Sequence, residues 1–322
     1  MRFWVASLVF LTFGAAAERL PALAADTTKI TVSGVSSGGY MAVQMHVAYS
    51  DRVSGAGALA AGPYYCAAGS LWTAWNTCMS GSPPASKADA ERFAREGRID
   101  PLANLAGAPV WLFSGTRDRT VIPAVVQALA KQYALFGAKL ALVQDKAAGH
   151  AMVTEHAGAA CDATEPPFIN DCDYDAAGEI LRHLLGSLSP PSGGGQIIEF
   201  EQDEFGAGRA ISMAKIGFAY VPQNCATGKC RVHVAFHGCR QGGEEIGDRF
   251  VREAGYNRWA ASNRLIVLYP QVVARTASWT FNPRGCWDWW GYTGAAYATK
   301  DAPQMRAVLA MVERLGSQPK ER

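Results

Sequence analysis

The sequence predicts an α/β fold with a mostly parallel central sheet. Strand-like and helical segments alternate along the chain, which is typical of a parallel sheet with helices on both faces. A Gly-x-Ser-x-Gly motif lies between a strand-like segment at residues 29–32 and a helical one at residues 40–48. Polar loops follow two later strand-like segments, and such loops build the functional sites of α/β sheets.

Apolar runs and helical spacing define the individual elements. Before a linker-like stretch rich in Ser, Pro and Gly at residues 187–195, they predict strands at residues 29–32, 56–60, 109–114 and 140–143 and helices at residues 40–48, 87–96, 121–136 and 174–185. After it, they predict strands at residues 197–200, 216–221, 232–236 and 265–269 and helices at residues 248–262 and 303–315. The part of the chain after this stretch contains no catalytic nucleophile with a base and an acid of its own. We therefore predict one domain over residues 26–322, with a single sheet built from both halves.

The composition is that of an ordinary globular protein. Of the 322 residues, 49% are hydrophobic and 18% are charged, which is ample material for a core. The formal net charge is only +2, and the Lys and Arg residues are scattered rather than clustered. Nucleic acid is therefore excluded as an expected partner.

The first 25 residues have the character of a signal peptide. Arg2 provides a positive start, an apolar run follows, and the small residues Ala22 and Ala24 fit a cleavage site near Ala25 or Asp26. The run is too short for a comfortable membrane span, although an uncleaved anchor is the alternative. We expect a secreted protein, extracellular or periplasmic, with no membrane span after cleavage.

Eight cysteines support an exported destination. An even count behind a signal peptide favours disulfides over metal, and no spacing matches a CxxC zinc pattern. Several lie close together in sequence, but the sequence leaves the connectivity open. The cysteines are Cys66, Cys78, Cys161, Cys172, Cys225, Cys230, Cys239 and Cys286. No metal site is predicted.

The Gly-Val-Ser-Ser-Gly motif at residues 34–38 places Ser36 in a sharp strand-to-helix turn. Such a turn forces the serine into strained backbone angles, and the flanking glycines avoid clashes. It would present the Ser36 hydroxyl at the end of the strand, with the Ser37 N–H facing a developing oxyanion at the helix N-terminus. The motif predicts a nucleophilic serine in an α/β-hydrolase fold; a plain Gly/Ser loop is the alternative.

A nucleophilic serine needs a base and an orienting acid, which follow it in this fold in the order Ser, Asp or Glu, His. Asp118 and His150 each follow a predicted strand, and Gly149 permits close approach beside the histidine. The alternative role of Asp118 is to form a turn, and His156 is the nearest competing histidine. We predict a triad of Ser36, Asp118 and His150.

A second oxyanion donor is expected from a His-Gly loop at the end of another strand. His237 and Gly238 form such a loop and lead to Cys239, whose N–H would join that of Ser37. In the usual chain order this loop precedes the serine, whereas here it follows the predicted histidine. A circular permutation of the sheet accounts for this order; an ordinary strand-end turn is the alternative.

A tryptophan-rich segment covers residues 279–292, and Pro and Gly interrupt it. Its aromatic side chains form either a buried cluster that closes the fold or an apolar wall for a substrate. Trp72 and Trp75, between the first two cysteines, would extend the same surface.

With these motifs in place, the chain resembles the polyhydroxybutyrate (PHB) depolymerase family of esterases, in particular its single-domain, circularly permuted extracellular type. The resemblance covers almost the whole predicted mature chain. It rests on residues 34–41, 114–118, 149–150, 237–241 and 286–291. It implies the same triad, the same two oxyanion donors, and contact of the polyester with a tryptophan among Trp287, Trp289 and Trp290.

The resemblance implies a monomeric serine esterase that needs no cofactor. It would hydrolyse poly(3-hydroxybutyrate) or 3-hydroxybutyrate oligomers through an acyl-enzyme. Many extracellular members carry a separate substrate-binding domain behind a linker, and no such module is expected here. Feruloyl or acetylxylan esterase activity is one alternative; a non-catalytic polymer-binding protein is an alternative of another class.

Overall fold

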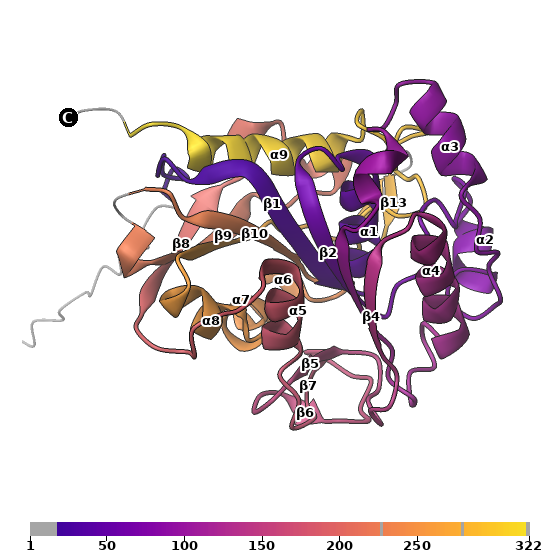
Figure 1. Ribbon diagram of the computed structural model, residues 1–322, viewed down its shortest axis with the longest axis horizontal. Helices are drawn as coiled ribbons and strands as arrows, with labels where there is room; N and C mark the ends of the chain where they lie inside the picture. Colours follow the sequence, from indigo (N-terminus) through magenta and orange to yellow (C-terminus); the bar gives the residue numbers. More distant parts are fainter. Residues whose placement is uncertain (1–17, 226–227, 278–279, 320–322) are drawn as a thin grey trace, which may run out of the picture.

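An eight-stranded sheet runs through the molecule in the order β4-β3-β2-β1-β10-β11-β9-β8 (Figure 1). The computed structural model describes residues 18–225, 228–277 and 280–319. The strands are β1 (Asp26–Val35), β2 (Val53–Leu59), β3 (Pro109–Phe113), β4 (Lys139–Val143), β8 (Gly195–Glu201), β9 (Ile216–Pro222), β10 (Arg231–Phe236) and β11 (Leu265–Tyr269). Neighbours are parallel except where β9 pairs with β11 and β8. The predicted α/β fold with a mostly parallel sheet is confirmed.

Helices bury both faces of this sheet, which is why its strands are apolar on both sides. One core contains side chains from α1 (Ser37–Ala48), α4 (Pro123–Leu135) and α9 (Pro303–Gly316). The other contains side chains from α5 (Ala176–Leu185), α7 (Arg249–Glu253) and α8 (Tyr256–Ser262). Successive residues of a strand alternate between the two cores, as Val234 and Ala235 do on β10.

Shorter elements complete the chain around these layers. The helices are α2 (Leu71–Asn76), α3 (Ala88–Arg95) and α6 (Gly243–Ile246), with 3₁₀ turns η1 (Leu102–Leu105), η2 (Asp203–Phe205), η3 (Arg209–Ile211) and η4 (Gln223–Cys225). A small sheet contains β5 (Met152–Thr154), β7 (Ile169–Asp171) and β6 (Ala159–Ala160), and β12 (Arg275–Ala277) pairs with β13 (Thr280–Asn282). The sequence predicted neither of these small sheets.

Strands from both sides of the linker-like stretch meet in the centre of the sheet. β1 pairs in parallel with β10, and Gly34 lies opposite Phe236. The turn that begins at Gly34 and the loop that begins at His237 therefore leave the sheet side by side. The circular permutation stays a prediction.

The prediction of one continuous helix at residues 248–262 is wrong. Residues 248–262 form two helices, α7 and α8, separated at Gly255, whose φ is +92°. That conformation suits glycine and ends a helix. The sequence also predicts a turn at residues 224–229, which lies partly outside the described residues because residues 226–227 are not described.

The predicted signal peptide lies largely outside the described residues, which begin at Glu18. Residues 18–25 pack onto the fold. Leu20 is fully buried, and the N–H groups of Leu23 and Ala25 donate to the Leu315 carbonyl at the end of α9. Cleavage near Ala25 would remove these contacts. In the described part of the chain, no helix combines the length and the apolar character that a membrane span requires.

Four disulfides confirm the prediction that the cysteines are paired. The bonds are Cys66–Cys78, Cys161–Cys172, Cys225–Cys230 and Cys239–Cys286. The last joins the loop after β10 to the tryptophan-rich segment, and its cysteines are 47 residues apart in sequence. It therefore closes a longer loop than the other three.

Loop length predicts unequal contributions of these bonds to stability. Replacing both Cys239 and Cys286 by Ala is expected to lower the free energy of unfolding by about 4 kcal/mol, because the bond restricts a long loop of the unfolded chain. Replacing both Cys225 and Cys230 by Ala is expected to lower the free energy of unfolding by about 2 kcal/mol, because these cysteines are only 5 residues apart in sequence. Urea denaturation of both double variants measures the difference. Equal losses would contradict the loop-length argument.

Candidate active site

Ser36 occupies a strained turn between β1 and α1. Its φ of 57° and ψ of −126° lie in a region that non-glycine residues rarely adopt, at a cost of roughly 1–3 kcal/mol. The Ser36 N–H donates to the Leu59 carbonyl at 2.9 Å and holds the turn in place. Gly38 presses against the end of β10, where an added Cβ would lie 2.3 Å from the Phe236 carbonyl oxygen. The small residues of the motif thus allow the nucleophile turn and β10 to touch.

The structure brings Ser36, His150 and Asp118 into one hydrogen-bonded chain. His150 Nε2 lies 2.8 Å from Ser36 Oγ, and His150 Nδ1 lies 2.8 Å from Asp118 Oδ2. A carboxylate can only accept, so Nδ1 carries the proton and Nε2 is left to accept from the serine hydroxyl. This is the tautomer that a general base for Ser36 requires.

Two backbone amides fix the Asp118 carboxylate. Its Oδ1 accepts from Thr120 N–H at 2.8 Å and from Val121 N–H at 2.9 Å, which leaves Oδ2 for His150. The side chain is buried, with 1% of its surface exposed. Asp118 therefore also forms a turn, which was the alternative role predicted for it. The turn orients the carboxylate so that Oδ2 faces His150.

The competing histidine lies elsewhere. The His156 side chain is 74% exposed and sits 3.7 Å from Glu155, with no described contact to Ser36. His150, in contrast, is buried, and its backbone N–H donates to Thr164 Oγ1 at 2.9 Å.

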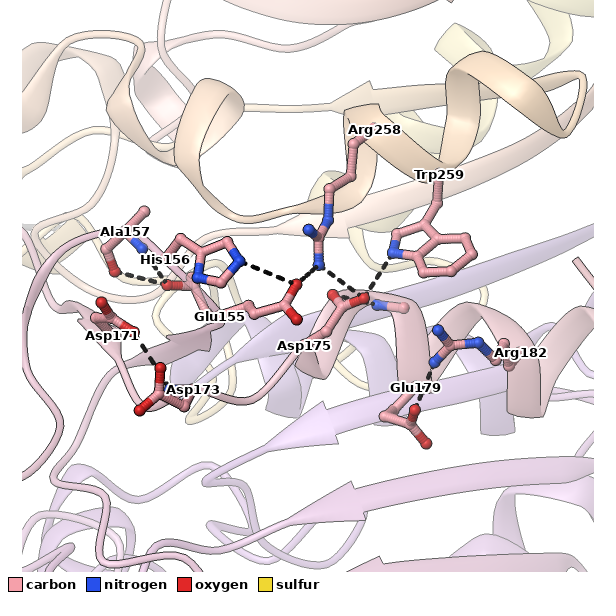
Figure 2. A network of polar contacts seen from close by, with 12 residues as sticks. Glu155, His156, Ala157, Asp171, Asp173, Asp175, Glu179, Arg182, Arg258 and Trp259 are labelled. Carbon is pink, nitrogen blue, oxygen red and sulfur yellow. Dashed lines mark hydrogen bonds and ion pairs between the residues drawn. The ribbon is translucent and has the colours of Figure 1, made fainter. Parts of the chain in front are cut away.

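Ionic contacts attach the segment after His150 to helix α8. Figure 2 shows the Arg258 guanidinium reaching both Glu155 and Asp175, at 2.5 and 2.8 Å. Asp175 also accepts from Trp259 Nε1 at 2.7 Å and from Gly178 N–H at 2.9 Å, which caps α5. This segment supplies one wall of the site, so the contacts position that wall relative to the sheet.

Two backbone amides are free to receive an oxyanion. Ser37 is the first residue of α1, and Cys239 follows the His-Gly pair at the end of β10. Neither amide donates a hydrogen bond to a described residue. The Ser37 side chain instead accepts from Trp287 N–H at 3.3 Å. Ser37 directly follows Ser36, and Cys239 lines the same cleft as Ser36, so both residues predicted as oxyanion donors lie at the site.

Ser36 and His150 open into a mainly apolar cleft of about 330 Å³. Trp289 and Trp290 line it, Tyr40 stacks on Trp289 with ring centroids 4.2 Å apart, and Trp75 contributes from α2. Trp287 does not line the cleft: it is fully buried against Phe236 and His237. The aromatic segment is therefore both a wall and part of the core. Trp279 lies outside the described residues.

Two residues of the site were not predicted. Tyr40 lies on α1, four residues after Ser36, and packs into the cleft wall. Gln241 accepts from Gly238 N–H at 2.7 Å and donates to the Pro167 and Phe168 carbonyls at 3.0 and 2.8 Å. The only sequence signal for Gln241 was its place just after the His-Gly pair.

A metal centre is not apparent in the described ranges. Residues 18–225, 228–277 and 280–319 contain no group of three or more His, Cys, Asp or Glu side chains that could hold a metal ion.

Buried histidines outside the triad predict a pH-dependent stability. Burial lowers the pKa of His46 to about 3, of His233 to about 3 and of His237 to about 4. The unfolded chain protonates these groups near pH 6.5. The unfolded state therefore binds more protons below that pH, and stability present above pH 6.5 is lost as pH falls toward 4.

We expect the free energy of unfolding to fall between pH 6 and 4, by up to about 1.4 kcal/mol per pH unit for each of these histidines. Urea denaturation at several pH values measures the slope. His46→Asn, which removes one of the three groups, should make the slope shallower. A stability that is flat over this range would contradict the burial argument.

Comparisons with known proteins place this geometry in context. A model of the prolyl oligopeptidase family matches residues 13–172. The chain is 45% identical over 316 residues to a poly(3-hydroxybutyrate) depolymerase of Delftia acidovorans, covering 94% of this chain but only 62% of that relative. It is 38% identical to a polyhydroxybutyrate depolymerase of Talaromyces funiculosus, covering 94% of both.

Solved structures agree with these relatives. A crystal structure of PHB depolymerase from Penicillium funiculosum superposes with a TM-score of 0.85 at 33% identity, covering 94% of this chain and all of that one. A serine-to-alanine variant of a PHB depolymerase, complexed with an R3HB trimer, matches with the same TM-score at 34% identity and the same coverage. The α/β-hydrolase fold predicted from the serine motif is thereby confirmed.

Proposed function

The chain belongs to the PHB depolymerase family, and from this premise we propose that it is a secreted serine esterase that hydrolyses poly(3-hydroxybutyrate) or its oligomers. One observation carries the proposal. Ser36, His150 and Asp118 are already linked at hydrogen-bond distance, and the serine opens into an apolar cleft. That arrangement suits an ester of low polarity.

The proposed reaction uses only side chains and amides of this chain. Ser36 Oγ attacks the ester carbonyl while His150 Nε2 takes its proton, and the negative charge on the carbonyl oxygen is stabilised by the amides of Ser37 and Cys239. The tetrahedral intermediate collapses, and His150 returns the proton to the departing alkoxide. Water, deprotonated by the same imidazole, then releases the acid and restores Ser36.

The cleft suggests how the acyl chain is held. Trp289 and Trp290 offer flat apolar surface, and the stacked Tyr40 ring fixes the orientation of Trp289. Trp287 is buried against Phe236 and His237 and does not line the cleft. We propose Trp289 and Trp290 as the substrate contacts.

Secretion is part of the proposal. Disulfides persist mainly in oxidising compartments, and this chain contains four. Cell fractionation tests secretion into the periplasm or the medium, and light scattering tests the predicted monomer.

A substrate panel tests the proposal. The protein is incubated with 3-hydroxybutyrate trimer, amorphous PHB, methyl ferulate and acetylated xylan, and acid release is followed, with Ser36→Ala as the blank. We expect release from the hydroxybutyrate substrates. Turnover of ferulate or acetylated xylan alone would keep the serine mechanism and overturn the polyester assignment. No turnover of any ester would favour the non-catalytic alternative.

A further inference from the structure

Two arginines lie together at the rim of the mainly apolar cleft. Arg240 and Arg284 both line the cleft, and both are exposed. The Arg240 N–H donates to the Arg284 carbonyl at 2.8 Å, and the disulfide Cys239–Cys286 joins the same two segments. Neither arginine takes part in the proton transfers described above. The fold therefore holds two positively charged residues next to each other beside the site.

The protein does not neutralise these charges. Among the described residues, neither guanidinium forms an ion pair, whereas other exposed arginines do. Glu244, four residues after Arg240, pairs with Arg209 instead, at 2.6 Å. The one described acidic residue that lines the cleft, Glu165, is exposed and is not paired with either arginine. Two neighbouring, unpaired positive charges at a cleft attract an anion.

Arg240 stands where a glycine would fit more easily. The Gln241 N–H donates to the Gly238 carbonyl at 3.2 Å, which closes a four-residue turn with Arg240 in its third position. The φ of Arg240 is +61°, a conformation for which Gly or Asn is usual at this position. Backbone strain of this kind is concentrated at active sites and ligand-binding sites. An arginine in this place therefore points to a use for its guanidinium.

The turn that carries Arg240 begins next to the nucleophile. A Cβ on Gly238 would lie 3.3 Å from Ser36 Cβ. Arg240 follows Gly238 by two residues, which separates their backbones by at most about 7 Å. The long arginine side chain can therefore reach the part of a substrate that lies next to the reacting ester.

An oligomer of 3-hydroxybutyrate presents one anionic group to such a site. Each of its ester bonds joins an acyl part, which Ser36 retains in the acyl-enzyme, to an alcohol part, which departs. The free carboxylate always belongs to the alcohol part, and it lies one unit beyond the last ester bond. Arginine binds carboxylates through two parallel N–H···O bonds, which few other side chains can form.

We propose that Arg240 and Arg284 bind the terminal carboxylate of 3-hydroxybutyrate oligomers and so mark the side of the cleft that holds the departing alcohol. The inference rests on the proposed ester hydrolysis. It adds to that function a preference for oligomers that end in a carboxylate over neutral esters of the same length. The aromatic wall of Trp289 and Trp290 carries no charge and does not supply this preference.

A neutral copy of the substrate tests the preference in the wild-type protein. We compare kcat/KM for the 3-hydroxybutyrate trimer with that for the same trimer whose terminal carboxylate is replaced by a carboxamide of the same shape. The carboxylate trimer should be preferred about 10-fold, mainly through a lower KM. Raising NaCl from about 0.05 to about 0.5 M should reduce the preference, because salt screens exposed charges, and should leave kcat/KM for the carboxamide trimer nearly constant.

Substitution of the two arginines locates the preference. In the double variant R240Q/R284Q, kcat/KM for the carboxylate trimer should fall about 10-fold, to the level of the carboxamide trimer. Lysine at both positions should keep part of the preference, because the charge stays while the paired N–H geometry is lost. Arg95→Gln is the matched control: Arg95 is exposed on α3, does not line the cleft, and its loss should leave the preference intact. Rates are normalised to active sites titrated with a fluorophosphonate, so a poorly folded fraction does not count.

The outcomes distinguish this inference from the proposed function. Equal kcat/KM for the two trimers in the wild type, or a preference that the double variant retains, would overturn the carboxylate site while the esterase assignment stands. An equal fall for both trimers in the double variant would also overturn it, since the arginines would then act on the cleft as a whole. A wild-type protein that hydrolyses no ester would overturn the proposed function and, with it, this inference.

Discussion

Replacing Ser36 by Ala is expected to lower kcat for 3-hydroxybutyrate trimer roughly 10⁶-fold, the scale of loss when the serine of a comparable triad is removed. The attacking oxygen disappears, and His150 Nε2 loses the hydroxyl that lies 2.8 Å away. The two oxyanion amides and the aromatic walls remain. Residual turnover of about 10³–10⁴ over the uncatalysed rate is therefore expected from binding and the oxyanion hole.

The same variant should still bind substrate. Because the cleft walls are unchanged, calorimetry should detect binding of the trimer, with a dissociation constant at or above the KM of the wild type, since accumulation of an acyl-enzyme lowers KM below the dissociation constant. A fluorophosphonate should label the wild type at Ser36 and leave the variant unlabelled.

Ser187→Ala is the matched control for the loss of a hydroxyl. Ser187 is exposed in the linker-like stretch and does not line the cleft. Full activity is expected there. If Ser36→Ala retained the wild-type rate, the nucleophile would have to be another residue.

The large elements of this fold were predictable because burial on both faces gives each strand a strong apolar signature. The run at residues 109–114 became β3, and the run at residues 265–269 became β11. The break between α7 and α8 was not predicted, since one glycine inside an apolar, helix-like pattern is tolerated in many helices. Here Gly255 adopts a positive φ and ends the pattern.

The short sheet of β5, β6 and β7 had no detectable signal for a different reason. Its strands have only two or three residues, too few for any periodicity to appear. The disulfide Cys161–Cys172 closes this segment on itself, and the Arg258–Glu155 contact, between residues 103 apart in sequence, attaches it to α8. Interactions of that kind cannot be read from local pattern.

The candidate site was predicted best where a motif demands a specific backbone. The serine turn needs glycines, so Ser36 and Ser37 could be assigned from five residues. The tryptophans could not be sorted in the same way, because the segment that carries them is irregular around residues 283–302 and has no period that separates inward from outward side chains. Trp287 is buried because it packs against Phe236 of β10 and His237 after it, contacts that join segments about 50 residues apart in sequence.

Replacing Asp118 by Asn is expected to lower kcat about 10⁴-fold, although the substitution changes neither size nor shape. The Thr120 and Val121 amides point at Oδ1, so an asparagine must place its oxygen there and its NH₂ group toward His150. That NH₂ donates to Nδ1, which must then give up its proton. The proton moves to Nε2, where the ring can no longer accept the proton of Ser36.

A variant of a buried aspartate outside the site shows whether the loss of kcat in Asp118→Asn comes from the wrong histidine tautomer or from lowered stability. Asp100→Asn is the matched control, since Asp100 is also buried and also accepts from a backbone amide, that of Asp51, but contacts Lys300 rather than the site. It should lower stability and leave kcat close to wild type.

In Asp118→Asn, activity should rise at alkaline pH, because hydroxide replaces the lost base, and the unfolding midpoint should change little. A kcat within 10-fold of wild type would mean that the two amides do not hold the asparagine oxygen and that the ring keeps its productive tautomer without the carboxylate.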